Sequence, residues 1–358
     1  MKRFCVLVLF LLPLFRGCIE DPDPNPPGEQ PDSGLFIINE GNFMADNASL
    51  SYYHMDSGKV MNDVFFDTND LPLGDVAVSM TIRDSLGYIV VNNSGRIYVM
   101  NTSTFGYVGK ITGLTSPRYI HFVNDNKAYV TDLYTRSVAV VDPVSMEVTG
   151  NIDVSNGSAD FIQHTTEQMV QVDQYIYTNC WSYDNQVLVI DTETDQVVDS
   201  IEVLKQPNSM ALDKYNNLWV LTDGGWQGSS YGYEKPGLLK VDIASRTAQV
   251  VYRFAAADYP TELNVNGTGD TLYYLNGGVY RFAIEGDAEP VMFLPGPADP
   301  PGYGGFYGLM VDPTSSELYV SDAIDYVQRG VVYRYSPGGT PLDTFQVGIA
   351  PGAFCIKP

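Results

Sequence analysis

The chain has 358 residues, of which 44% are hydrophobic, and its 43 acidic residues against 20 basic ones give a net charge of −23. This excess of negative charge argues against nucleic acid and against anionic lipid surfaces as binding partners, because both carry the same sign. We therefore expect no nucleic-acid partner.

The N-terminal part of the chain is typical of an exported lipoprotein. Residues 1–17 begin with Lys2 and Arg3, followed by an apolar run from Phe4 to Phe15 that is too short to span a bilayer, which indicates a lipoprotein signal peptide. Gly17 precedes Cys18, so Cys18 is the predicted lipidation site; ordinary secretion with cleavage nearby is the alternative. Residues 18–33 begin with this cysteine and are acidic and proline-rich, which predicts an extended tether. We expect a surface-exposed lipoprotein of the cell outer membrane that contacts the membrane through its lipid anchor only.

A pattern of four short strands repeats seven times over residues 34–358. Each strand is rich in β-branched or aromatic residues and is bounded by turn residues, whereas no window has the periodicity of a helix. The first strands of the copies begin near Asp75, Ser116, Ser158, Gln206, Tyr259, Gly304 and Ala350. This period of roughly 40 to 50 residues is the size of one propeller blade. The sequence predicts an all-β fold, a single seven-bladed β-propeller with four-stranded blades and almost no helix.

The two ends of this region predict how the ring closes. The chain enters at Gly34 with a segment that matches a second strand, and the tail from Ala350 supplies the missing first strand. Because an open sheet would leave unpaired edge groups, we expect the C-terminal strand to pair into blade one. Cys180 and Cys355 then lie in distant parts of the ring, so both are expected to be free thiols.

A search for catalytic and metal-binding motifs returns little. The histidines His54, His121 and His164 have no metal-ligand spacing with one another or with cysteine, and no nucleophile elbow or phosphate-binding loop is present. We therefore expect that the protein is not an enzyme and that it has no metal and no cofactor. The alternative is a propeller hydrolase or dehydrogenase, which would require a metal or quinone in the central channel.

Long aromatic loops gather on one rim of the predicted propeller. This rim, which we call the loop-rich rim, carries the turns from second to third strands and the links between blades. Loops on a rigid scaffold are common places for binding residues, and aromatic rings offer large contact areas. The alternative is that several of these rings only seal gaps between blades. The predicted ligand-binding residues are Asn42, Phe43, Asp132, Tyr134, Trp181, Tyr183, Asn185, Asp223, Trp226, Tyr231, Tyr233, Tyr303, Phe306 and Tyr326.

The repeats resemble a known group of propellers. YVTD at Tyr129, YTNC at Tyr177 and YVSD at Tyr319 look like the YVTN or YncE-type repeat. Together with the lipoprotein signal, the tether and the entry LFIINEGNF, they are similar to the BtuG family of surface lipoproteins. The resemblance implies capture of cobalamin or another corrinoid, as a transported ligand rather than a cofactor, and delivery to a BtuB-like TonB-dependent transporter of the outer membrane. A structural or adhesive propeller remains an alternative.

Overall fold

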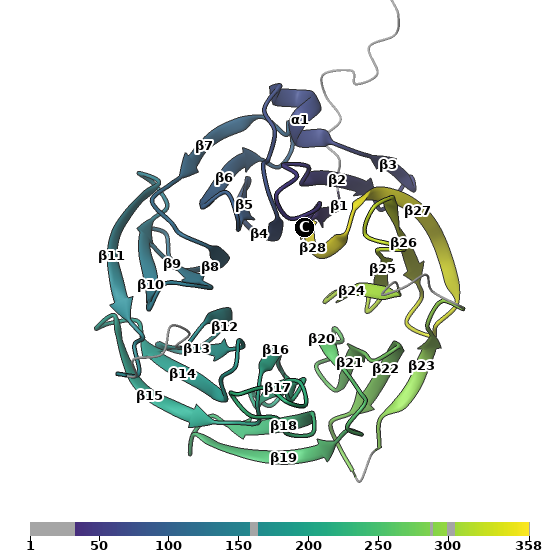
Figure 1. The fold of residues 1–358 in the computed structure, drawn as a ribbon. Coiled ribbons are helices and arrows are strands. Elements are labelled where there is room, and N and C mark those ends of the chain that lie inside the picture. The colour runs from purple at the N-terminus through teal and green to yellow at the C-terminus, as the bar shows by residue number, and fades with distance from the viewer. Residues whose placement is uncertain (1–32, 158–163, 287–288, 299–304, 358) are drawn as a thin grey trace, which may run out of the picture.

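The computed structural model describes residues 33–157, 164–286, 289–298 and 305–357. The signal peptide, Cys18 and nearly all of the predicted tether lie outside the described residues. Seven four-stranded antiparallel sheets are arranged around a central channel like the blades of a propeller (Figure 1). The predicted fold class, blade number and strand number per blade are confirmed.

The strands of the first four blades follow one another in the order that the repeats predict, from the channel outward. Blade one consists of β28 (Pro351–Lys357), β1 (Gly34–Asn39), β2 (Ser49–His54) and β3 (Lys59–Met61). Blade two consists of β4 (Ala77–Arg83), β5 (Leu86–Val91), β6 (Arg96–Asn101) and β7 (Tyr107–Ile111). Blade three consists of β8 (Pro117–Asn124), β9 (Lys127–Asp132), β10 (Ser137–Asp142) and β11 (Glu147–Asp153). Blade four consists of β12 (Thr166–Val172), β13 (Tyr175–Cys180), β14 (Gln186–Asp191) and β15 (Gln196–Glu202).

The remaining blades have the same order. Blade five consists of β16 (Pro207–Leu212), β17 (Leu218–Thr222), β18 (Gly237–Asp242) and β19 (Thr247–Arg253). Blade six consists of β20 (Thr261–Val265), β21 (Thr271–Leu275), β22 (Gly278–Ala283) and β23 (Val291–Pro295). Blade seven consists of β24 (Phe306–Val311), β25 (Leu318–Asp322), β26 (Arg329–Tyr335) and β27 (Pro341–Ile349).

Strand β1 shows why the second strand of a blade is apolar on both faces. Its six residues are all buried. Because successive side chains of a strand point to opposite faces, Leu35 and Ile37 pack into the core shared with blade seven, whereas Phe36 and Ile38 pack toward blade two. The outermost strands alternate instead, as β11 does, because only one of their faces is covered. Burial between neighbouring blades therefore holds the ring together.

The ring closes as predicted. Strand β28 pairs antiparallel with β1, from Gly34 opposite Lys357 to Asn39 opposite Pro351. The backbone of Glu40 also donates to the carbonyl of Ala350 at 2.9 Å. The C-terminal strand thus covers the inner edge of blade one and leaves no open sheet edge there.

Two details differ from the expectation. In the described residues the first strand of blade four begins at Thr166, whereas the sequence predicted its start near Ser158. Ser158 itself lies outside the described residues. In the described residues a single short helix, α1 (Val64–Asn69), covers blade one and buries Val64.

Both remaining cysteines, Cys180 and Cys355, are free, as predicted. Within the described part of the chain, no helix has the length and apolar character needed to cross a bilayer.

Candidate functional site

One residue from each blade forms a ring inside the channel. Every innermost strand has a shift of register directly after its first residue, and bulges of this kind re-aim side chains and are frequent near functional sites. The residue at that position lines the channel in all seven blades. We call these residues the channel ring: Val78, Arg118, Glu167, Asn208, Glu262, Tyr307 and Gly352.

The channel ring surrounds a cavity of about 670 Å³. Deeper in the channel its wall mixes apolar side chains, such as Met80 and Met169, with polar ones, such as Gln168 and Asn264. The cavity also contacts Trp181 and Asp223, which follow second strands and therefore belong to the loop-rich rim. A cavity of this size with a few polar groups is typical of a small-molecule site.

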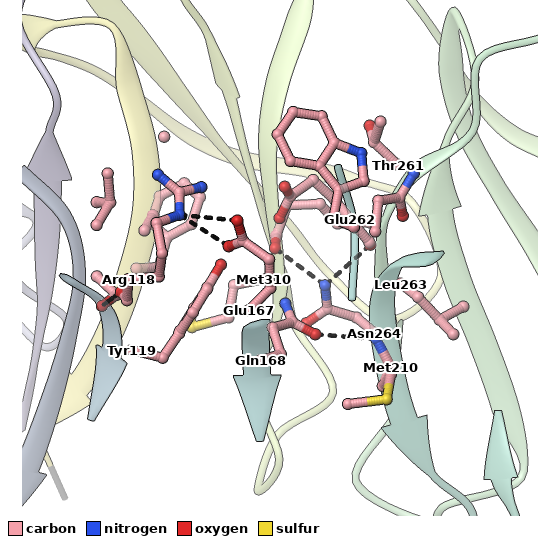
Figure 2. A pocket seen from close by; sticks show the side chains of 18 of the residues that line it. Arg118, Tyr119, Glu167, Gln168, Met210, Thr261, Glu262, Leu263, Asn264 and Met310 are labelled. Carbon is pink, nitrogen blue, oxygen red and sulfur yellow. Dashed lines mark hydrogen bonds and ion pairs between the residues drawn. The ribbon is translucent and has the colours of Figure 1, made fainter. Parts of the chain in front are cut away.

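Arg118 and Glu167 form the charged pair of the cavity. The Nε atom of Arg118 donates to both carboxylate oxygens of Glu167, at 3.0 and 2.8 Å (Figure 2). Burial lowers the pKa of Arg118, but the adjoining Glu167 carboxylate outweighs burial, so the pKa lies above its ordinary value. Within the described residues, the two Nη atoms of Arg118 make no hydrogen bond. This guanidinium therefore stays charged and keeps donors available for a ligand.

Two further carboxyl groups, those of Glu40 and Glu262, belong to the same cavity. Burial raises the pKa of Glu40, and the hydrogen bond from Tyr307, at 2.8 Å, opposes that shift only in part. Burial, together with the negative charge of Glu40, raises the pKa of Glu262 to about 8. Glu262 therefore holds its proton at neutral pH and can donate as well as accept. Its carboxyl makes no hydrogen bond to any described residue.

Gly352 provides the space that Glu40 occupies. A Cβ atom at this position would lie 2.2 Å from the Oε1 atom of Glu40, closer than any real contact allows. The absence of a side chain on the closing strand thus admits a carboxyl from the loop after β1 into the channel ring.

Trp181 and Asp223 meet at the mouth of the cavity. The indole nitrogen of Trp181 donates to Asp223 at 3.0 Å, and the backbone of Gly225 donates to the other carboxylate oxygen at 2.8 Å. Burial raises the pKa of Asp223 although both bonds favour the ionised form. The exposed ring of Tyr259 contacts the same cavity. Two predicted site residues are therefore brought together here.

Asn42 and Tyr326 contact the channel ring indirectly, through Tyr307. The side-chain amide of Asn42 donates to the carbonyl of Tyr326 at 2.5 Å. The ring of Tyr326 lies edge-on to that of Tyr307, with centroids 5.2 Å apart. These two predicted residues thus lie behind the ring rather than on the cavity wall.

Several predicted aromatic residues form the outer part of the loop-rich rim. Phe43 is 70% exposed, and Tyr134 and Trp226 are each 55% exposed. Tyr183 packs against the exposed Tyr231, with ring centroids 4.5 Å apart. These rings are accessible to a ligand or partner larger than the cavity.

The remaining predicted residues have local structural contacts. The buried carboxylate of Asp132 accepts hydrogen bonds from the backbone amides of Tyr134 and Thr135 in its own loop. It also accepts one from the amide of Ser116, just before β8, at 2.7 Å. The hydroxyl of Tyr233 donates to the carbonyl of Ala256 at 3.1 Å. The side-chain amide of Asn185 donates to Glu202 at 3.4 Å. Phe306 was expected in a loop, but it is the first residue of β24. Tyr303 lies outside the described residues.

The charged residues of the channel ring were not found from the sequence. Arg118, Glu167 and Glu262 are polar positions within first strands, where they suggest solvent-facing side chains. Their common position in the repeat, second in each innermost strand, is the signal that points to the channel. One group of described residues, His164, Cys180 and Asp184 beside Trp181, has atoms suited to hold a metal ion.

These features define the class: a seven-bladed β-propeller with a ligand-sized, polar-walled cavity at the loop-rich end of its channel. The chain belongs to the family described as Domain of unknown function (DUF5074), whose model matches residues 33–346. Among curated protein sequences, none matches it.

Solved structures of similar fold come from proteins of different descriptions. A quinonprotein alcohol dehydrogenase-like protein from Bacteroides thetaiotaomicron has a TM-score of 0.68 and 15% identity, covering 90% of this chain and 77% of that one. The periplasmic gluconolactonase of Pseudomonas aeruginosa has a TM-score of 0.64 and 12% identity, covering 90% and 99%. Apo AztD from Citrobacter koseri has a TM-score of 0.55 and 10% identity, covering 91% and 97%. At these identities the likeness shows the propeller fold alone.

Proposed function

We propose that this protein captures cobalamin or a related corrinoid at the loop-rich end of its channel and is not an enzyme. The corrinoid lies across the mouth, and one or more of its amide arms enters the cavity. A corrinoid is large, broadly flat and fringed with amides, so it requires a wide aromatic surface and matched hydrogen-bonding groups rather than a strongly charged pocket.

The observation that carries this proposal is the balance of charge and hydrogen bonding on the cavity wall. Arg118 is neutralised by Glu167 yet keeps its Nη donors, and Glu262 is protonated at neutral pH. Amide groups, which both donate and accept, match such a wall without bringing a charge into it. The exposed Tyr259 at the mouth, and the exposed Trp226 and Tyr231 on the outer part of the loop-rich rim, supply apolar contact area.

The cellular role follows from the sequence features that precede the propeller. A lipid anchor at Cys18 and an acidic tether hold the propeller at the surface of the outer membrane. A BtuB-like TonB-dependent transporter then receives the corrinoid from the loop-rich rim. Exposed apolar side chains on this rim, such as Phe43 and Met44, suit contact with a partner protein.

Titration calorimetry with the purified protein tests the proposal. We expect saturable binding of cobalamin with one ligand per chain at micromolar concentration or below. Haem serves as the matched control, since it is a flat macrocycle with carboxylates in place of amides, and the charge of the protein disfavours it. Absence of saturable cobalamin binding, or equal binding of haem, would contradict the corrinoid assignment.

A second function, hydrolysis of a lactone, is favoured by one observation. A carboxyl group with its pKa near the working pH, such as that of Glu262, is suited to general acid–base catalysis. If this were the function, a lactone panel would show turnover above the uncatalysed rate, and Glu262→Gln would abolish it. We expect no such turnover.

A further inference from the structure

Three side chains with different ligand atoms meet at the end of blade four nearest the loop-rich rim. His164, Cys180 and Asp184 each offer one ligand atom, and these atoms all lie within 4.8 Å of one another. The Nδ1 atom of His164 is 2.6 Å from a carboxylate oxygen of Asp184. The side chain of Cys180 is fully buried, and those of His164 and Asp184 are each only 13% exposed.

The fold brings His164 next to Cys180 and Asp184, which lie beyond β12 in the sequence. Cys180 ends β13 and pairs with Thr166 at the start of β12, and His164 lies two residues ahead of that strand. Asp184 belongs to the turn from β13 to β14. This distance along the chain explains why no metal-ligand spacing was evident in the sequence.

Backbone hydrogen bonds fix the turn that carries Asp184. The amide of Trp181 donates to the carbonyl of Thr165 at 3.1 Å, and the amide of Ser182 donates to the Thr165 hydroxyl at 2.8 Å. The amide of Asn185 donates to the second carboxylate oxygen of Asp184 at 2.7 Å. One carboxylate oxygen is therefore held by the backbone, while the other faces His164.

We propose that His164, Cys180 and Asp184 bind one Zn²⁺ ion through an imidazole nitrogen, a thiolate and a carboxylate oxygen. Zinc prefers four ligands of this kind, and three protein ligands leave one position for water or for a ligand group. Ca²⁺ and Mg²⁺ fit poorly, because they prefer oxygen ligands throughout. The thiolate and the carboxylate together balance the charge of the ion.

The placement of Cys180 beside a carboxylate favours a bound cation. Its side chain is fully buried, and its sulfur lies within 4.8 Å of a ligand atom of Asp184. A divalent cation that binds here displaces the thiol proton. The alternative is a plain contact between His164 and Asp184, with Cys180 as an apolar core residue; that arrangement would bind no metal.

Zinc at this position would also hold the turn that carries Trp181. Trp181 directly follows Cys180 and contacts the cavity, so fixing the turn would fix one wall of the mouth. This consequence rests on the proposed corrinoid function, whereas the metal site does not.

The test uses the full chain in mild detergent, stripped with a chelator and titrated with Zn²⁺ against a competing indicator. We expect one equivalent of bound Zn²⁺, and at least tenfold weaker binding in His164→Gln and in Cys180→Ser. Cys355→Ser is the matched control, because it removes the other free thiol of the propeller, and it is expected to bind like the unchanged chain. Cys5 and Cys18 are the same in all variants.

Co²⁺ provides a direct readout of the sulfur ligand. A Co²⁺-loaded chain should show the near-ultraviolet absorption of a metal–thiolate bond, and Cys180→Ser should lose it while Cys355→Ser keeps it. If Cys180→Ser does not fold, the Zn²⁺ affinity of His164→Gln, a substitution at the rim, decides whether the site exists. Failure to bind one equivalent of metal, or binding unaffected by His164→Gln, would overturn the zinc site. Because cobalamin titration is measured separately, failure of the corrinoid proposal leaves this result interpretable.

Discussion

The hydroxyl of Tyr307 in blade seven donates a 2.8 Å hydrogen bond to Glu40, which follows β1, the second strand of blade one. The contact therefore crosses the seam where the two ends of the propeller meet. Glu40 occupies the space left by Gly352 of the closing strand, and its backbone bonds to Ala350. Closure of the ring and assembly of the cavity wall consequently depend on the same few residues.

Removal of residues 350–358 is expected to destabilise the whole propeller. The deletion uncovers the edge of β1 and removes Phe354 and Ile356 from the core between blades seven and one. Loss of these half-buried side chains, together with the pairing of β28 with β1, amounts to several kcal/mol, which lowers Tm by on the order of 10 °C. Thermal melting followed by circular dichroism measures the effect. An unchanged Tm would show that β28 is dispensable for closure.

The fold could be predicted almost completely because its information is local and repeated. Each blade repeats the same apolar strands and turn residues, and the entry at Gly34 with the tail from Ala350 indicated how the ring closes. Exact strand bounds were harder to predict than strand order, because the repeat recurs as a pattern of strands and turns rather than at fixed positions. In blade four, for example, the described first strand begins at Thr166 and not near Ser158.

The candidate site was only partly predictable because it is assembled across blades. Trp181 and Asp223 follow second strands, so strand direction alone placed them on the loop-rich rim. Arg118 and Glu167 are 49 positions apart in the sequence, and only the circular arrangement makes them neighbours. Their pairing, and the raised pKa of Glu262, depend on burial in a channel that no single repeat contains.

Cys18→Ala is expected to release the protein from membranes without unfolding the propeller. The prediction depends on the lipid chains being the anchor, and Cys18 precedes every described strand. Fractionation of cells into membrane and soluble parts, with circular dichroism of the released protein, measures both properties. Cys355→Ser provides a control that keeps the anchor, and retention of Cys18→Ala on the membrane would contradict the prediction.

Glu262 is expected to make stability fall as pH rises from about 4.5 to about 8. Its pKa is raised to about 8 in the folded protein from an ordinary value of 4.5. The folded state therefore keeps a proton that the unfolded chain loses. The stability that this proton contributes is fully present below the unfolded pKa of 4.5 and is lost once the pH passes the folded pKa of about 8. The total loss in the free energy of unfolding is roughly a few kcal/mol, since each unit of pKa shift corresponds to about 1.4 kcal/mol.

Denaturant unfolding of Glu262→Gln across this pH range provides the measurement. Glutamine keeps the shape and the neutral character of the protonated carboxyl, so the variant should gain stability relative to the unchanged chain as pH rises. Glu285→Gln is the control. Contacts with Tyr215 and Lys214 lower the pKa of Glu285, so its effect on stability has the opposite sign. Parallel pH profiles for Glu262→Gln and the unchanged chain would disprove the assignment.

Aromatic residues of the loop-rich rim are expected to dominate corrinoid binding. Trp181 contacts the cavity, and Trp226, Tyr231 and Tyr326 were predicted as anchors on the same rim. Replacing a true anchor by alanine should weaken binding by roughly 1 to 4 kcal/mol, about fivefold to nearly a thousandfold in Kd. Trp181→Ala should have the largest effect among them, because its indole also fixes the buried carboxylate of Asp223.

Tyr215→Ala is the matched control, since this tyrosine is 60% exposed and lies in the turn between β16 and β17 on the opposite rim. Substitutions in the turn at Asn124 and Asn126, also on that rim, should likewise leave Kd unchanged. Surface plasmon resonance with immobilised protein gives Kd for each variant, and melting curves separate loss of binding from loss of fold. If opposite-rim substitutions abolished binding while Trp181→Ala did not, the ligand would enter the channel from the other end, and the site described above would be wrong.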